Sequence, residues 1–122
     1  MNTSNKIRVL GLMSGTSMDA LDMCLAEINF AENDSFSYNI IKSVSEPLNT
    51  KSRSIIQNAV DGENIETAHT HLGKLFSHLC VKNFDSENMD AIAMHGQTIA
   101  HADGMMTHQI GAPQFLADVF QI

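Results

Sequence analysis

The segment from Gly11 to Asp22 has the residue types that a nucleotide-phosphate site needs. Gly15 can turn the backbone with positive φ and bring it close to a ligand. Successive N–H groups in such a turn bind an anion, and Asp19 and Asp22 are candidate ligands for the Mg²⁺ that accompanies nucleotides. It is not a Walker A loop, because the Gly-Lys-Ser/Thr ending is missing and a second strand follows instead of a helix. The segment favours another kind of phosphate hairpin, and the alternative is an ordinary turn rich in Gly, Ser and Asp.

A second polar segment, His95 to Thr98, comes directly after the short apolar run Met89–Met94. Ligands of open α/β sheets bind at the carboxyl ends of the strands, which is where this segment is expected to lie. Gln97 and Thr98 suit hydrogen bonds to sugar hydroxyls, and Gly96 allows a ligand to approach closely. The segment predicts a substrate site, and the alternative is a strand-ending loop with an ordinary hydrogen-bonded histidine.

The six histidines match no compact metal-ligand pattern. The residues that could be imagined as a transition-metal set have the wrong spacing: His95, His101, Asp103 and His108. Those on or beside a predicted helix lie away from the centre of its apolar stripe and are expected to be solvated: His69, His71 and His78. No serine or cysteine has a neighbouring base, so no catalytic nucleophile is assigned.

The elements that must position these segments follow an α/β order. Alternating or apolar stretches predict three strands, the first two paired as an antiparallel hairpin: 7–13, 20–28 and 36–44. A helix is predicted from Thr50 as N-cap to a stop at Asp61-Gly62. Apolar residues at three- and four-residue spacing predict a longer second helix: Ala68, Leu72, Leu75, Phe76 and Leu79. Strands over 89–94 and 107–110 come next.

A last helix is predicted from Pro113, with an apolar face made of Phe115, Leu116, Val119 and Phe120. No Gly, Lys or Pro follows it, so it has no recognisable C-terminus, and we expect the chain to be truncated. The whole order predicts one α/β domain over residues 1–122, a layer of the RNase H type that lacks its final strand.

Composition excludes several classes of partner. Fourteen acidic residues against seven basic ones give a net charge of -7, without the basic face that nucleic acid or anionic lipid requires. The hydrophobic fraction of 43% is that of a globular protein, and no apolar run approaches the length of a membrane span or a signal peptide. Cys24 and Cys80 are expected to be reduced and buried, so the protein is expected in the cytoplasm.

Three blocks, 11–22, 95–101 and Gln109-Ile110-Gly111, together resemble the anhydro-N-acetylmuramic acid kinase family of bacterial cell-wall recycling. Their order and separation follow the family over nearly the whole chain, and Met-Ser-Gly-Thr-Ser-x-Asp is the most specific block. The resemblance implies the actin-like fold of acetate and sugar kinases, heat-shock cognates and actin. That fold has two lobes with RNase H-like cores and ATP in the cleft between them. This chain would be the incomplete first lobe, without the second.

The family uses ATP and water to open the 1,6-anhydro ring of the sugar and phosphorylate O6. The resemblance implies that the ATP-phosphate hairpin contains Gly15, Thr16, Ser17, Met18, Asp19, Ala20, Leu21 and Asp22, with Asp19 on Mg²⁺. It implies that the sugar side contains His95, Gly96, Gln97 and Thr98. The general-base aspartate and the adenine pocket belong to segments absent here, so the 122 residues alone are expected to be inactive. The expected partner is a small-molecule sugar, and a homodimer is compatible with the sequence.

Two positions depart from the family pattern. Ala20 stands where the family usually has glycine, and we expect a slightly different or strained hairpin there. Ala112 stands where the family usually has aspartate, and the loss of that helix N-cap should cost about 1 kcal/mol.

Two other functions compete with the kinase. A non-enzymatic remnant or binding module would keep the half-site and cover a partner chain with the apolar face of the last helix. An RNase H-like nuclease would use Asp19, Asp22 and other carboxylates on Mg²⁺, although the acidic charge disfavours nucleic acid.

Overall fold

A computed structural model describes residues 5–14, 19–100 and 107–122. The elements in chain order are β1 (Lys6–Ser14), β2 (Ala20–Phe30), β3 (Phe36–Pro47), α1 (Thr50–Val60), α2 (Ile65–Phe84), β4 (Ala91–Ala100), β5 (Thr107–Ile110) and α3 (Gln114–Phe120). The α/β class and the antiparallel pairing of the first two strands are confirmed. Among the described residues, no helix is both long enough and apolar enough to cross a bilayer.

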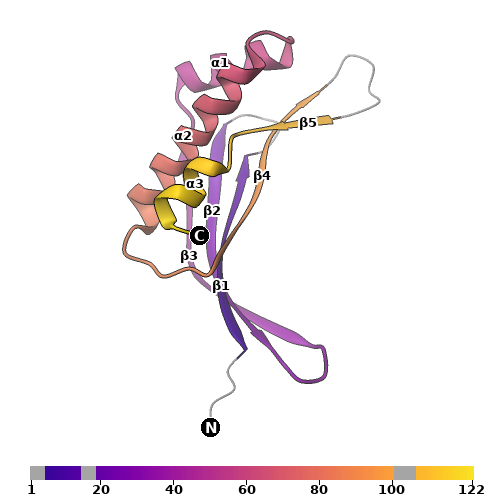
Figure 1. The fold of residues 1–122 in the computed structure, drawn as a ribbon, viewed down its shortest axis with the longest axis vertical. Coiled ribbons are helices and arrows are strands. Elements are labelled where there is room, and N and C mark those ends of the chain that lie inside the picture. Colours follow the sequence, from indigo (N-terminus) through magenta and orange to yellow (C-terminus); the bar gives the residue numbers. More distant parts are fainter. Residues whose placement is uncertain (1–4, 15–18, 101–106) are drawn as a thin grey trace.

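The strands form one sheet in the order β3-β2-β1-β4-β5 (Figure 1). The first three strands are antiparallel neighbours, whereas β4 runs parallel to β1. A parallel pair needs a crossover connection, and α1 and α2 supply it. β5 pairs antiparallel with β4 only over Gln97–Ala100, near the carboxyl end of that strand. The carboxyl ends of β1 and β4 therefore lie at the same edge of the sheet.

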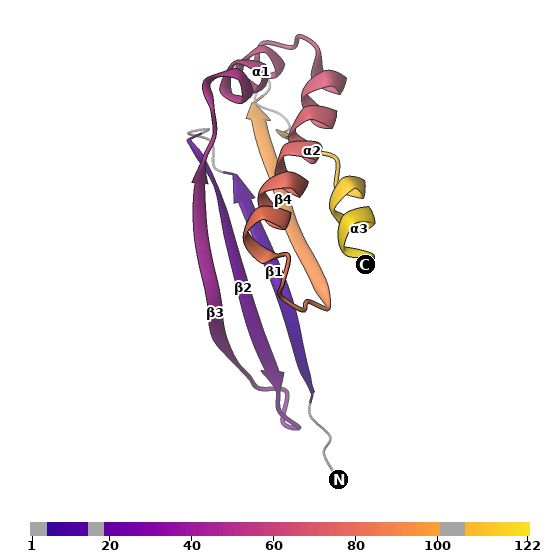
Figure 2. The ribbon, with the colours of Figure 1, turned by 90° about the vertical axis from the view of Figure 1, so that its left-hand side faces the viewer.

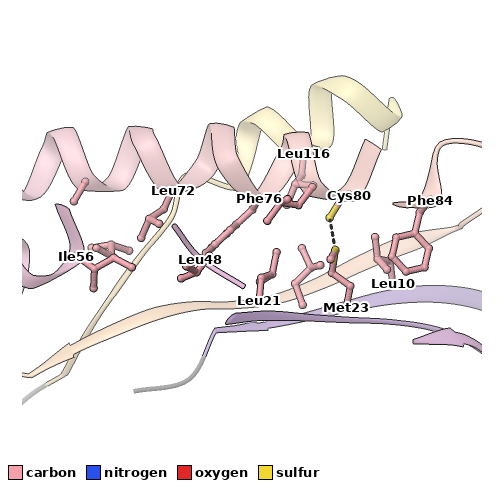
Figure 3. Close-up of a cluster of buried hydrophobic side chains, with 14 of the residues drawn as sticks. Leu10, Leu21, Met23, Leu48, Ile56, Leu72, Phe76, Cys80, Phe84 and Leu116 are labelled. Carbon is pink, nitrogen blue, oxygen red and sulfur yellow. Dashed lines mark hydrogen bonds between the residues drawn. The ribbon is translucent and has the colours of Figure 1, made fainter. Parts of the chain in front are cut away.

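All three helices lie on one face of the sheet, and the hydrophobic core lies between them (Figures 2 and 3). The strands contribute every second residue to this core, as in β2, where Leu21, Met23 and Leu25 are fully buried. Phe76 and Phe84 of α2 are also fully buried and point from the helix toward the sheet (Figure 3). In the described part of the chain, no helix covers the opposite face of the sheet, which we call the open face. The open face carries a shallow depression of about 520 Å³.

The helix ends differ in detail from those predicted. Asn49, not Thr50, is the N-cap of α1, because its side chain accepts a hydrogen bond of 2.8 Å from Ser52 N. The predicted stop of α1 is confirmed, with Asp61 as C-cap and Gly62 at φ 85°.

The last helix does have an end, contrary to the prediction. Gln121 adopts the left-handed conformation, with φ 57° and ψ 46°, and its N–H donates to Ala117 O. The N–H of Ile122 donates to the same carbonyl at 3.1 Å, so a non-glycine residue terminates the helix by the usual hydrogen-bond pattern. At the start of α3 the N-cap is Pro113 and not residue 112, so an aspartate at the position of Ala112 would lie one residue before the cap.

The two cysteines are free thiols in different surroundings. Cys80 is fully buried against Met23, and burial raises the pKa of its thiol to about 12. Cys24 is only half-buried and lines the depression on the open face, so the prediction of burial is wrong for this residue.

We expect the native protein to take up one equivalent of a thiol reagent at pH 8, on Cys24, because Cys80 is inaccessible and protonated. A Cys24→Ser variant should react only after unfolding in urea. Rapid labelling of that variant in buffer would contradict the core described here.

Candidate functional site

The polar segment predicted to follow a strand lies inside β4. Leu12 pairs with Met94 and Ser14 pairs with Gln97, so two residues of β4, His95 and Gly96, occupy the space opposite one residue of β1. This is a β-bulge, and Gly96 accommodates it with φ 80°. The predicted end at residue 94 was wrong because β5 pairs with the strand beyond the bulge.

Ser14 and Gln97 join the two motif segments. Ser14 is the last residue of β1 and is 2% exposed, and Gln97 is 0% exposed. The Ser14 hydroxyl donates a hydrogen bond to Gln97 Oε1. Buried polar groups require such partners. This contact therefore fixes the residue that precedes the predicted phosphate hairpin against the His95–Thr98 segment.

The remaining residues of the predicted sugar segment are placed as follows. The His95 side chain is exposed, and its Nδ1 lies 3.3 Å from the carbonyl oxygen of Gly96. Thr98 pairs with Gln109 in the β4–β5 ladder. A direct sugar contact by Gln97 or Thr98 stays a prediction. The Gln97 side chain is buried and accepts the hydrogen bond from Ser14.

The predicted phosphate hairpin is described only on its second strand, because Gly15, Thr16, Ser17 and Met18 lie outside the described residues. The Asp19 side chain is 68% exposed and 3.8 Å from Arg53 Nη2, an ion pair too exposed to hold it firmly. Asp22 is exposed and lines the depression on the open face, whereas Leu21 is in the core and offers a ligand only its backbone.

Ala20 does not strain the hairpin at its own position. It pairs with Pro47 in the β2–β3 ladder and is not among the residues with positive φ. Alanine is acceptable there because the backbone is in an ordinary strand conformation, so the expected strain at residue 20 is wrong.

Helix α2 also contributes to the site, through His69, which the sequence analysis did not predict. His69 of α2 accepts a hydrogen bond at Nδ1 from Gly111 N, at 3.0 Å, and its carbonyl accepts one from Ala112 N, at 2.9 Å. Gly111 ends the Gln-Ile-Gly block and has φ 121°, so α2 holds this turn beside the bulge of β4. The sequence signal for this contact is Gly73, because a glycine inside an amphipathic helix can mark a place where another segment packs closely.

Two of the three helix histidines are not simply solvated, contrary to the prediction. His69 makes the contacts above, and His71 Nε2 lies 3.0 Å from Ser52 Oγ. Burial, and to a lesser extent the charge of Lys51, lowers the pKa of His71. His78 is exposed, as expected.

Within the described ranges, no group of three His, Cys, Asp or Glu residues could hold a metal ion. His101 and Asp103 of the imagined transition-metal set lie outside those ranges. A hydrated Mg²⁺ needs less, because it keeps several waters and takes one or two carboxylates together with phosphate oxygens. The exposed carboxylate of Asp19, within the predicted phosphate hairpin, fits that requirement.

The hydrogen bond between Ser14 and Gln97 should contribute measurably to the stability of the protein. Ser14→Ala removes the hydroxyl donor and should lower the free energy of unfolding by about 1–2 kcal/mol. In a double-mutant cycle with Gln97→Leu, the two effects should fall short of additivity by about 1 kcal/mol in urea unfolding. Ser43→Ala, an exposed serine on the open face, is the matched control and should change stability by less than about 0.5 kcal/mol. Additive effects of the first pair would mean that the hydrogen bond contributes nothing.

Comparison with known proteins gives a consistent picture. Residues 7–122 match the sequence profile of a family described as anhydro-N-acetylmuramic acid kinase. Curated proteins of that name include one from Bacillus cereus (strain Q1), 35% identical over 89% of this chain and 32% of its own length. Another, from Sulfurimonas denitrificans, is 33% identical over 75% of this chain and 26% of its own length. A third, from Rhodococcus erythropolis, is 30% identical over 92% of this chain and 31% of its own length. The chain thus spans about a third of the length of these relatives.

Proposed function

The chain belongs to the anhydro-N-acetylmuramic acid kinase family, and we propose that it supplies the first part of an ATP-dependent sugar kinase. The reaction consumes the 1,6-anhydro sugar, ATP and one water. Water opens the anhydro bridge at C1, the freed O6 takes the γ-phosphoryl group, and N-acetylmuramic acid 6-phosphate and ADP result. This chemistry would return a cell-wall sugar to amino-sugar metabolism in the cytoplasm.

One observation carries the proposal beyond resemblance. The proposed phosphate hairpin follows the carboxyl end of β1, and the proposed sugar segment lies in the second half of the parallel neighbour β4, where Gln97 pairs with Ser14. A phosphate donor at one segment and a sugar hydroxyl at the other would therefore be adjacent, which phosphoryl transfer requires. The buried hydrogen bond between Ser14 and Gln97 supports the same arrangement, because it fixes the two segments to each other.

Asp19 is the residue that would hold Mg²⁺, directly or through water. Bound Mg²⁺ neutralises the charge of the ATP phosphates. The backbone N–H groups of the hairpin around Gly15–Ser17 would orient those phosphates, since the chain offers no lysine of the Walker type there. Gln97 and Thr98 are proposed for the sugar side, together with His95 and Gly96.

The general base and the adenine pocket are proposed to lie in the part of the family's length that these 122 residues do not span. The chain alone would then be inactive. The proposed architecture is the RNase H-like first lobe of the actin-like fold, and the order β3-β2-β1-β4 with β4 parallel to β1 supports it.

The experiment is a chimera in which this chain replaces the matching third of the Bacillus cereus (strain Q1) relative. We expect formation of ADP that depends on 1,6-anhydro-N-acetylmuramic acid, and none from the relative deprived of that third. Asp19→Asn in the chimera should raise the Mg²⁺ concentration needed for half-maximal rate. A folded chimera that makes no sugar-dependent ADP, beside an active parent, would sink the proposal.

A further inference from the structure

A small pocket opens where β5 leaves the sheet. It has a volume of about 220 Å³, and its lining joins α2, the bulge of β4 and the turn after β5. The residues that matter are His69, His95, Gly96 and Gly111. Two of them are glycines with positive φ, 80° and 121°, so the backbone itself forms part of the wall. The pocket therefore brings the His-Gly and Gln-Ile-Gly blocks together around a histidine of α2.

The hydrogen bond of His69 defines which of its nitrogens carries a proton. Nδ1 accepts from the N–H of Gly111 at 3.0 Å, so Nδ1 is unprotonated and the neutral ring carries its proton on Nε2. A second bond, from Ala112 N to the carbonyl of His69, fixes the backbone of the same residue. The ring thus lines the pocket in one tautomer, with Nε2–H as its only donor.

The turn on the other side of the pocket is held just as closely. A side chain at Gly111 would meet Met94 Cε and Phe76 Cε2, each at 3.1 Å, in addition to the unfavourable φ. Pro113 follows and removes a further backbone donor. The lining combines apolar side chains with two histidines and exposed backbone, so it has few polar groups, as small-molecule sites usually do.

The geometry points to this pocket as a subsite for one oxygen-bearing substituent of the sugar, with His69 as both its donor and its positioning residue. This inference rests on the proposed function. Nε2–H of His69 donates to an oxygen acceptor, and Nδ1 holds Gly111 in place. Three substituents of the anhydro sugar present such an oxygen: the acetamido carbonyl, the carboxylate of the lactyl ether and the C4 hydroxyl.

The two roles of His69 can be separated in the ¹⁵N-labelled chain by NMR. Asparagine places an oxygen where Nδ1 stands, so His69→Asn should keep the slow hydrogen exchange of the Gly111 amide but lose the donor. Glutamine reaches the position of Nε2, so His69→Gln should speed Gly111 exchange at least about tenfold, the effect of one lost hydrogen bond. Equal protection of Gly111 in both variants would overturn the positioning role.

Titration with 1,6-anhydro-N-acetylmuramic acid tests the subsite. We expect shifts at Gly96 and Gly111 and a dissociation constant about fivefold to tenfold higher in His69→Asn. The matched probe, 1,6-anhydro-N-acetylglucosamine, lacks the lactyl carboxylate. Loss of binding by this probe assigns the subsite to the carboxylate, and equal binding of the two sugars assigns it to a substituent that both share, the acetamido group or the C4 hydroxyl.

Shifts confined to other residues would overturn the subsite while leaving sugar binding, and so the kinase proposal, intact. Unchanged affinity in His69→Asn would do the same. The absence of any shift at millimolar sugar would also overturn the subsite, whereas the kinase proposal is judged separately by ADP formation in the chimera.

Discussion

Phe76→Ala is expected to lower the free energy of unfolding by about 4 kcal/mol. Phe76 is fully buried in α2, at the centre of the contacts between helix and sheet (Figure 3). Its ring also lies beside Gly111, which lines the proposed subsite. Truncation would remove transfer free energy and leave a cavity that the sheet cannot collapse to fill. Urea unfolding followed by circular dichroism measures the change.

Phe36→Ala is the matched control, because it deletes the same atoms from a side chain that is 65% exposed. It should cost less than about 1 kcal/mol. Since a domain of this size has a total stability of about 5–15 kcal/mol, the core variant should lose a large share of that stability and the control should not. Similar losses in both variants would contradict the core described here.

Gly73→Ala is expected to destabilise the protein by about 3 kcal/mol, although alanine is the better helix former by about 1 kcal/mol. A Cβ at this position would lie 2.5 Å from the carbonyl oxygen of Ala112 and 2.8 Å from its nitrogen. These are backbone atoms of a turn that His69 holds by two hydrogen bonds, so they cannot move aside cheaply. The variant should also speed hydrogen exchange at Gly111.

Thr70→Ala is the control on the same helix, because Thr70 is exposed and the substitution tests helix propensity alone. It should be neutral or slightly stabilising, within about 0.5 kcal/mol. If Gly73→Ala is also stabilising, then α2 does not pack against the turn at Ala112 as described, and the wall of the proposed subsite is wrong.

Local patterns were sufficient to predict most of the elements. The alternation of Leu21, Met23 and Leu25 marked β2 and its buried face, and the three- and four-residue spacing around Leu72 and Phe76 marked α2. Both predictions are confirmed, because each element buries one face against the same core. Alternation was less informative for β3. Phe36, Tyr38 and Ile40 form a strand as expected, but they are 65%, 66% and 48% exposed.

The site was predictable as two motifs but not as an assembly. Nothing local in the sequence says that β4 continues through His95 and Gly96, because a bulge against β1 and pairing with β5 produce that geometry. His69 was missed for the same reason, since its partner, Gly111, is 42 residues away in the chain. The N-cap of α1 was predicted to within one residue, since it is Asn49 and not Thr50.

The central claim is that this chain forms part of a kinase that opens the anhydro ring and phosphorylates the sugar. The most direct measurement is mass spectrometry of the product made by the chimera from 1,6-anhydro-N-acetylmuramic acid and ATP in ¹⁸O-labelled water. We expect N-acetylmuramic acid 6-phosphate with one ¹⁸O at C1 and none in the phosphate. ADP formed with labelled inorganic phosphate and unchanged sugar would show ATP hydrolysis instead and would contradict it.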